Sequence, residues 1–279
     1  MKIDIVIPAT RRSVNHLLWS ISQGTTLPNR VIVVTNEITN VESFSTHYPT
    51  DVVRFSSREY PIGDADQALR RNIGIWESDA EAVMTLDDDL FAPDDLVTTA
   101  TAEVIGRRVV WGHHRYIDFD AYGERLLALE PEHGRSREHG VNRKHLWYSA
   151  YAGLMVAETQ ILRDVGGYDM MFLCRHGNED QSLGRRINHH LDRGDEIWVS
   201  EPPFAWHPTE DRTHGKTKTN FCNSQSWLEE IHINGVRFLR CARPACTYRV
   251  FADEEAHLFS DTVVIPYDPC TVTLRKERI

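Results

Sequence analysis

The sequence predicts an α/β fold in which a mostly parallel β-sheet is flanked by helices. Short apolar runs rich in β-branched residues alternate with amphipathic segments through the first third of the chain. This alternation is typical of parallel strands joined by helical crossovers. The chain has 279 residues, of which 41% are hydrophobic and 26% charged, so it can bury a large core. We therefore expect one compact unit, without a low-complexity tract or a fixed-period repeat.

The first elements along the chain predict a βαβ unit. Residues 3–7 are expected to form the first strand, and Ser13 is a plausible N-cap for the helix that follows. Gly24 is placed to end that helix, and residues 30–34 supply a second apolar strand. Two such strands joined by a helix are expected to lie parallel in one sheet.

The next strand and helix lead to an acidic strand end. Residues 52–55 fit a third strand, and Asp64 and Gln67 have the spacing of a capping box at the start of a helix that continues through Trp76. Residues 82–86 then form a buried strand that stops at three successive acids. Ligands of open α/β sheets gather at the carboxyl ends of the strands, so we expect the chemistry there.

The middle of the chain is less regular. A strand is expected at residues 109–111, and a hairpin is expected from residues 116–119 and 125–129. The polar stretch 130–144 is interpreted as a mobile loop, and residues 152–156 return to the core.

The last third supplies one more helix and strand before the chain changes character. A helix is expected to open near Glu179, and residues 197–199 fit a strand. We assign residues 1–215 to one domain, with halves at 1–115 and 116–215. Residues 216–279, which include a helix near Trp227 and two or three β-runs, are interpreted as a small C-terminal lid or assembly extension.

The three acids after residue 86 predict a metal site. Like charges a few ångströms apart repel one another, and a divalent cation relieves that conflict. Mg²⁺ and Mn²⁺ prefer oxygen ligands, so Asp87 and Asp89 suit a metal-diphosphate site. Asp88 lies between them and is expected to act as a spacer on an extended backbone. A solvated acidic turn is the alternative interpretation.

Six segments together resemble a known enzyme family. In chain order they are IDIVIPATRR from Ile3, VIVVTN from Val31, RRNIG from Arg70, LDDD from Leu86, GGYD from Gly166 and NEDQSLGRR from Asn178. Their order and spacing over about residues 1–215 resemble the family 2 glycosyltransferases. The resemblance implies a GT-A (Rossmann-like) fold and transfer of a sugar from a nucleotide-diphosphate sugar, with a UDP-sugar favoured, to an acceptor hydroxyl.

The resemblance also implies which residues bind the donor. These are Pro8, Ala9, Thr10, Arg11, Asn36, Glu37, Arg71, Asp87 and Asp88. Arg71 would approach the diphosphate, because a guanidinium offers paired donors to phosphate, whereas Arg70 is interpreted as an exposed helix charge. The family usually has an acid at the position of Thr35, which leaves the recognition of the base and the choice of nucleotide open.

Glu179 and Asp180 are the candidate catalytic residues. Both begin a predicted helix, where the helix dipole and free N–H groups favour an ionised carboxylate. The family resemblance implies that Asp180 is the general base of an inverting single displacement, with Glu179 beside it as a possible acceptor ligand. The residues alone do not rank the two acids and do not exclude retention, and helix capping is the alternative role for both.

A histidine after the strand near residue 199 is a candidate third metal ligand. Many GT-A enzymes use a histidine at such a place, which here implies His207, and His214 is the competing candidate. Nitrogen suits Mn²⁺ better than Mg²⁺, so a histidine ligand would favour manganese.

Composition excludes some classes of partner. The formal net charge is −10, so general binding of nucleic acid is not expected. The first apolar run is too short to span a bilayer, and a cytoplasmic protein without an integral membrane segment is the expectation. The five cysteines lack CxxC spacing and are interpreted as free thiols.

Other functions compatible with these residues are a retaining GT-A transferase, a sugar-1-phosphate nucleotidyltransferase and an inactive protein that binds carbohydrate or nucleotide. The nucleotidyltransferase is disfavoured because the segment after the first strand lacks a glycine-rich loop. Oligomeric state and the acceptor stay open, because acceptor choice depends on variable loops.

Overall fold

The computed structural model describes residues 1–10, 13–35, 39, 41–42, 47–57, 67–117, 135–136, 143–146, 153–170, 179–193, 196–208, 228–233, 236–241 and 267–279. The strands are β1 (Ile3–Ala9), β2 (Arg30–Thr35), β3 (Thr50–Ser57), β4 (Ala82–Leu86), β5 (Val109–Ile117), β6 (Arg135–Ser136), β7 (Arg143–Leu146), β8 (Leu154–Glu158), β9 (Glu196–Pro208), β10 (Leu228–Ile233), β11 (Val236–Cys241) and β12 (Val272–Arg278). The helices are α1 (Asn15–Ser22), α2 (Gln67–Glu77), α3 (Leu96–Arg107), α4 (Thr159–Asp164), α5 (Glu179–His190) and the 3₁₀ turn η7 (Pro269–Thr271).

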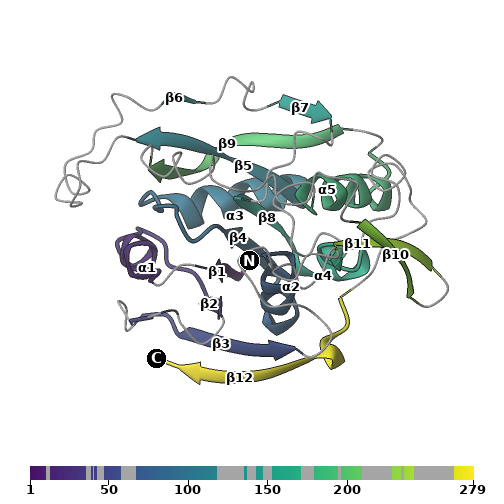
Figure 1. Cartoon of the computed structure of the whole chain (residues 1–279). Helices are drawn as coiled ribbons and strands as arrows, with labels where there is room; N and C mark the ends of the chain where they lie inside the picture. The colour runs from purple at the N-terminus through teal and green to yellow at the C-terminus, as the bar shows by residue number, and fades with distance from the viewer. Residues whose placement is uncertain are drawn as a thin grey trace.

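One mixed sheet organises the described part of the chain (Figure 1). Its strand order is β12-β3-β2-β1-β4-β8-β5-β9-β7, with β6 paired to β5, while β10 and β11 form a separate two-stranded sheet. Strands β3, β2, β1 and β4 are parallel neighbours. Strands β8 and β5 then continue the sheet in antiparallel pairs. The predicted α/β class, with parallel strands flanked by helices, is confirmed.

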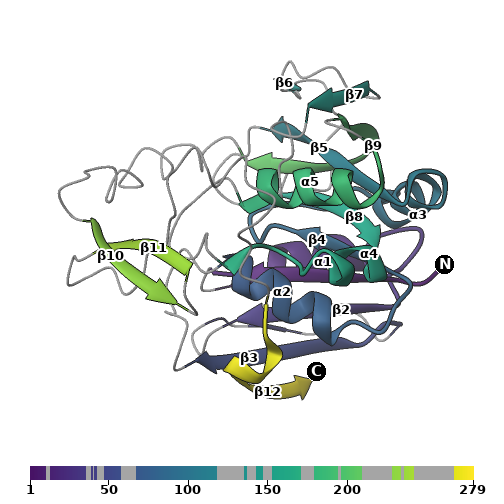
Figure 2. The same ribbon diagram turned by 90° about the vertical axis from the view of Figure 1, so that its right-hand side faces the viewer.

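Each face of the sheet has its own apolar core. On one face, helices α2, α4 and α5 pack on the sheet around Val6, Ile32 and Met155, and these helices face the viewer in Figure 2. On the other face, α1 and α3 pack around Ile5 and Ile7. Successive residues of β1 therefore serve opposite cores, as the period of two in a strand requires. A strand buried on both faces is mainly apolar, which explains the composition of β1. The exception is Asp4, which is buried and paired with Arg30.

Helix α2 approaches β1 closely because a glycine lies at the contact. A Cβ atom added to Gly74 would lie 2.2 Å from Cγ1 of Val6, far inside van der Waals contact. A close approach of this kind is one of the structural reasons for glycine inside a helix. The contact fixes the height of α2 above the sheet, and α2 carries Arg70 and Arg71.

Several predicted elements differ from the structure. Helix α3 was not predicted, and the strand expected at residues 197–199 belongs to the much longer β9. Part of the stretch 130–144, interpreted as a mobile loop, forms β6 and the start of β7. The second arm of the hairpin expected at residues 125–129 and the helix expected near Trp227 lie outside the described residues, although β10 begins directly after Trp227.

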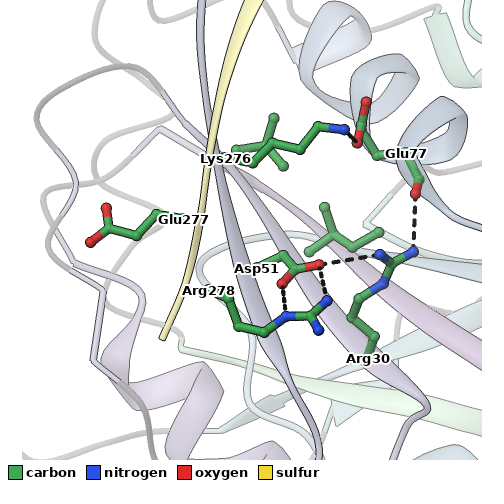
Figure 3. A pocket seen from close by; sticks show the side chains of 8 residues that line it. Arg30, Asp51, Glu77, Lys276, Glu277 and Arg278 are labelled. Atoms are coloured by element: carbon green, nitrogen blue, oxygen red, sulfur yellow. Dashed lines mark hydrogen bonds and ion pairs between the residues drawn. The ribbon is translucent and has the colours of Figure 1, made fainter.

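The end of the chain returns to the central sheet. Strand β12 pairs antiparallel with β3, from Val272 opposite Ser57 to Arg278 opposite Asp51, so these residues form the edge of the main sheet. The guanidinium of Arg278 donates two hydrogen bonds to Asp51, at 2.6 and 3.0 Å (Figure 3). The boundary proposed at residue 215 lies outside the described residues and stays a prediction.

A charged pocket of about 370 Å³ lies between the end of α2 and the strands β2, β3 and β12 (Figure 3). Its walls pair charges of opposite sign: Lys276 with Glu77, and Arg30 with Asp51. Arg30 and Asp51 lie at the starts of the parallel strands β2 and β3. The pocket is therefore at the amino ends of these strands, whereas the acids that follow β4 are at the carboxyl ends.

Candidate functional site

The acids that follow β4 lie at the switch point of the parallel sheet. Strand β1 has β2 on one side and β4 on the other. The chain passes from β1 to β2 and β3 in one direction, and the crossover through α2 from β3 then places β4 on the other side of β1. Ligands of such sheets bind at the carboxyl ends of the strands beside the switch point. The backbone N–H of Thr10, just after β1, donates to Oδ2 of Asp88 at 2.5 Å, and the Thr10 hydroxyl donates to the same oxygen at 3.0 Å.

The expectation that Asp88 lies on an extended backbone is wrong, because residues 88 and 89 form a turn. The backbone N–H of Leu90 donates to the carbonyl oxygen of Asp87 at 3.3 Å, so the chain turns here. The turn buries Asp88, which is 5% exposed, and leaves Asp87 and Asp89 partly exposed. Asp88 therefore joins the ends of β1 and β4, while its two neighbours border the accessible side of the turn.

Arg71 connects this turn to the predicted catalytic helix. Its Nη2 donates to Oδ1 of Asp87 at 2.7 Å and to Oε1 of Gln67 at 3.0 Å. Its Nη1 donates to Oε1 of Glu179, the first residue of α5, at 3.0 Å. The Arg71 side chain is 1% exposed, and its Cζ lies 5.2 Å from the centre of the Tyr168 ring. Three segments distant in sequence thus meet at one guanidinium.

The charges around Arg71 hold it as a permanent cation. Burial by itself lowers the pKa of Arg71, but attraction to the carboxylates of Asp87 and Glu179 outweighs burial, and the net effect raises that pKa. Burial raises the pKa of Tyr168 to about 12, against the opposing effect of Arg71. Neither group exchanges a proton near neutral pH, so both act here by position and polarity.

Arg70 is not the exposed helix charge that the sequence predicted. Its side chain is 1% exposed, its Nη1 donates to the carbonyl oxygen of Ala9, and its Cζ lies 5.3 Å from the centre of the Phe55 ring. A buried arginine needs an acceptor for its donors, and the last carbonyl of β1 supplies one. Arg70 thereby anchors the segment Pro8, Ala9 and Thr10, which was predicted to contact the nucleotide.

The two predicted catalytic acids occupy different environments. Glu179 is 6% exposed and ion-paired with Arg71, whereas Asp180 is partly exposed. Oδ1 of Asp180 accepts the N–H of Gln181 at 2.8 Å, within the first turn of α5. Oε2 of Glu179 is buried without a hydrogen-bond partner in the described structure. Of the pair, Asp180 is the more exposed to solvent.

A short backbone bridge brings β9 against the acidic turn. Phe91 and Trp206 exchange two hydrogen bonds, from the N–H of Phe91 at 2.8 Å and from the N–H of Trp206 at 2.9 Å. The backbone of His207, the next residue in β9, pairs with Tyr116 of β5. The bridge is antiparallel, so His207 follows Trp206 toward Leu90, beside the turn that carries the acids. The His207 side chain lies outside the described part.

The carboxylate oxygens of Asp87 and Asp89 are of the kind that binds a hard divalent cation. Oδ1 of Asp87 accepts Arg71, but Oδ2 of Asp87 makes no hydrogen bond in the described part, and this side chain is 25% exposed. Asp89 is also partly exposed on the same turn. Carboxylate oxygens that reach solvent are the ligands Mg²⁺ and Mn²⁺ prefer. Among the residues described with their side chains, no three His, Cys, Asp or Glu gather at one metal-sized point.

Some predicted residues cannot be placed. Arg11, Asn36, Glu37 and His214 lie outside the described residues. Thr35, where the family usually has an acid, ends β2, and its hydroxyl lies 2.5 Å from the hydroxyl of Thr39.

Comparison with known proteins identifies the architecture. No protein-family model and no curated protein sequence matches the chain. Among solved structures, S. aureus TarS matches with a TM-score of 0.50 and 15% sequence identity, over 76% of this chain and 37% of TarS. S. aureus TarS 1-349 in complex with UDP matches with a TM-score of 0.50 and 16% identity, over 75% of this chain and 60% of that one. GalNAc-T7 with UDP, GalNAc and Mn²⁺ matches with a TM-score of 0.50 and 14% identity, over 75% and 44%.

The chain has the GT-A glycosyltransferase fold. This confirms the fold that the sequence resemblance implied. The chain spans between 37% and 60% of the length of these three structures. No helix in the described residues is long and apolar enough to cross a membrane.

Sequence reasoning missed three residues that shape this GT-A site. Gln67 accepts a hydrogen bond from Nη2 of Arg71, the nitrogen that also donates to Asp87. The ring of Tyr168 lies against the same guanidinium. The side-chain amide of Asn72 accepts the N–H of Tyr168 and donates to its carbonyl oxygen, both at 2.7 Å. A signal existed: Gln67 lies one helical turn before Arg71. The pairing of Asn72 with Tyr168 is long-range and has no local sequence signal.

Proposed function

We propose that this chain is a metal-dependent glycosyltransferase that moves a sugar from a nucleotide-diphosphate sugar to an acceptor hydroxyl. The observation that carries the proposal is the contact of one buried guanidinium, that of Arg71, with both Asp87 and Glu179. It brings the acids after β4 and the acids that open α5 to one place at the switch point of a GT-A sheet. The UDP bound in two of the structural neighbours supports a UDP-sugar as the donor.

Asp87 and Asp89 would hold a Mg²⁺ or Mn²⁺ ion, with His207 as the third ligand. The ion would supply charge neutralisation for the leaving diphosphate. The Mn²⁺ in the GalNAc-T7 structure supports a divalent metal in this fold. Thr10 and the preceding residues of β1, anchored by Asp88 and Arg70, would bind the nucleotide, together with Arg11, Asn36 and Glu37.

Asp180 would act as the general base of a single displacement. Its carboxylate takes the proton of the acceptor hydroxyl as that oxygen bonds to the anomeric carbon of the donor. The bond from the anomeric carbon to the diphosphate oxygen breaks with its electron pair, and the nucleoside diphosphate leaves. One backside attack inverts the anomeric centre. The partial exposure of Asp180 supports this role over that of Glu179, which is buried and paired with Arg71.

Calorimetric titration with UDP, GDP and dTDP tests the donor site. Each nucleotide is added with and without Mn²⁺, to the wild-type protein and to Asp89→Ala. We expect UDP to bind only with the metal, and Asp89→Ala to weaken binding by at least about tenfold. Folded protein that binds none of the three nucleotides would remove the donor-site assignment. Metal-dependent binding without turnover of any nucleotide sugar would instead indicate the inactive binding protein.

A further inference from the structure

One buried cation spans the two sides of the site. Nη2 of Arg71 donates to Asp87, on the side proposed to bind the sugar donor. Nη1 donates to Glu179, at the start of helix α5, on the side proposed to bind the sugar acceptor. The planar fork of a guanidinium can hold two carboxylates in fixed directions, whereas the single ammonium of a lysine cannot reproduce that geometry. The relative position of the two acids therefore depends on the shape of this side chain as well as on its charge.

Glu179 depends on Arg71 for its charge compensation. The Glu179 side chain is 8% exposed, and Arg71 is its ion-pair partner in the described structure. Its second oxygen, Oε2, is buried without a partner, and so is Nε of Arg71. A buried charge that loses its counter-ion must take up a proton or move toward water. Because Glu179 is the first residue of α5, either response disturbs the turn that carries Asp180.

The surroundings hold the guanidinium in place. Gln67 accepts a hydrogen bond from Nη2, and the Tyr168 ring packs against the guanidinium. Tyr168 is in turn fixed by the two hydrogen bonds of its backbone to Asn72. Both Nη atoms of Arg71 thus already bond to protein oxygens. This favours a residue that orients other groups over one that turns to bind the diphosphate.

We propose that Arg71 is a positioning residue, which acts through Glu179 to fix the start of α5, and hence Asp180, relative to the donor-side acids. The proposal rests on the function proposed above and refines the expectation that Arg71 contacts the diphosphate. A positioning residue changes the turnover rate, whereas a diphosphate ligand changes the affinity for the nucleotide.

The first test follows backbone hydrogen exchange in the full-length protein without ligands. Arg71→Lys keeps the charge but cannot span both acids. Arg163→Lys is the matched control, because Arg163 is a partly buried arginine that bonds the carbonyls of Ile75, Trp76 and Ser78 at the end of α2, away from both acids. We expect Arg71→Lys to speed exchange in the first turn of α5 by roughly tenfold or more, and Arg163→Lys to leave that turn unchanged.

The second test separates binding from turnover with the same variants. UDP with Mn²⁺ is the binding probe, and release of UDP from UDP-glucose, UDP-GlcNAc and UDP-GalNAc measures turnover. We expect Arg71→Lys to lower kcat by about a hundredfold or more while the dissociation constant of UDP changes by less than about threefold. In a double-mutant cycle, Arg71→Lys with Glu179→Gln should lower kcat no further than the stronger single variant, because both changes weaken the same charged contact.

The outcomes separate the two proposals. Unchanged exchange at the start of α5, additive losses in the cycle, or a rise of about tenfold in the UDP dissociation constant of Arg71→Lys overturns the positioning role. A wild-type protein that binds no nucleotide and turns over no nucleotide sugar overturns the proposed function. The exchange experiment needs no ligand, so it decides the link between Arg71 and α5 even in that case.

Discussion

Asp88 accepts two hydrogen bonds from Thr10, and through them the turn after β4 is joined to the end of β1. Both donors reach the same oxygen, Oδ2, at 2.5 and 3.0 Å. Because Asp88 is 5% exposed, this is a charge-assisted contact in a largely desolvated place. The middle acid of the triplet therefore joins two strand ends, while its two neighbours are partly exposed on the same turn.

Asp88→Ala should destabilise the protein and weaken nucleotide binding together. Loss of the carboxylate leaves the backbone N–H of Thr10 without its acceptor, which is expected to cost about 1–3 kcal/mol in the free energy of unfolding. Thr10→Val keeps that N–H and removes only the hydroxyl, so it should cost about 0.5–1.5 kcal/mol. Urea denaturation and UDP titration measure the two effects. Equal stability of Asp88→Ala and wild type would show that the contact does not hold the turn.

Local pattern predicted the sheet well because the pattern and the burial have the same cause. Strand β4 was predicted at its observed bounds, since a run buried on both faces is mainly apolar and this one ends where the acids begin. The edge strand β12 follows a different rule. Its burial alternates at the start and then gives way to exposed charges, and its pairing with β3 joins opposite ends of the sequence, which no local pattern encodes.

The site was predicted in its residue types more than in its contacts. The position of Asp87 and Asp89 could be predicted because the buried run of β4 stops at the three acids, whereas their role as metal ligands stays a prediction. The burial of Arg70 could not, since an arginine on a helix is normally solvated, and only the carbonyl of Ala9 and the ring of Phe55 explain its position. Helix α3 was missed although Leu96, Ala100 and Val104 have helical spacing.

Gly74→Ala should destabilise the fold, whereas Gly106→Ala should not. A methyl group at Gly74 would overlap Val6 and push α2 away from β1, at a cost of about 1–3 kcal/mol. Gly106 is also helical, but an added Cβ would meet nothing within 4 Å. There the substitution should stabilise α3 by about 0.5–1 kcal/mol. Thermal and urea unfolding of both variants test this, and a loss at Gly106 as large as at Gly74 would contradict the packing argument.

The ion pair between Arg278 of β12 and Asp51 of β3 should make part of the stability depend on pH. The hydrogen bond from Arg278 lowers the pKa of Asp51 from its ordinary value of 3.8; burial opposes this, and attraction to Arg278 and Arg30 adds to it. A lowered pKa in the folded state gives stability that is present above the ordinary value and is lost as the pH falls through the folded value.

Asp51→Asn should therefore cost stability at neutral pH and reduce the further loss below about pH 4. The matched control is Asp79→Asn, because Asp79 also pairs with Arg30 but its side chain is 85% exposed. Its stability and pH dependence should follow the wild type. The midpoint of urea unfolding, measured from neutral pH down to about pH 3, reports both variants. Parallel curves for Asp51→Asn and wild type would show that the contact with Arg278 leaves the titration of Asp51 unaffected.

Asp180→Asn and Glu179→Gln should separate the two acids of α5. Asparagine keeps the size of Asp180 and an oxygen that can accept the N–H of Gln181, but it cannot take a proton from an acceptor hydroxyl. Loss of a general base is expected to lower kcat by about 10²–10⁴-fold with UDP binding retained. In Glu179→Gln the side-chain oxygen can still accept a hydrogen bond from Arg71, although the ion pair is lost. We therefore expect a smaller fall in kcat than in Asp180→Asn, caused by a less exact alignment of the start of α5. A nearly inactive Glu179→Gln beside an active Asp180→Asn would exchange the roles of the two acids, and a buried glutamate paired with Arg71 would then have to be the base.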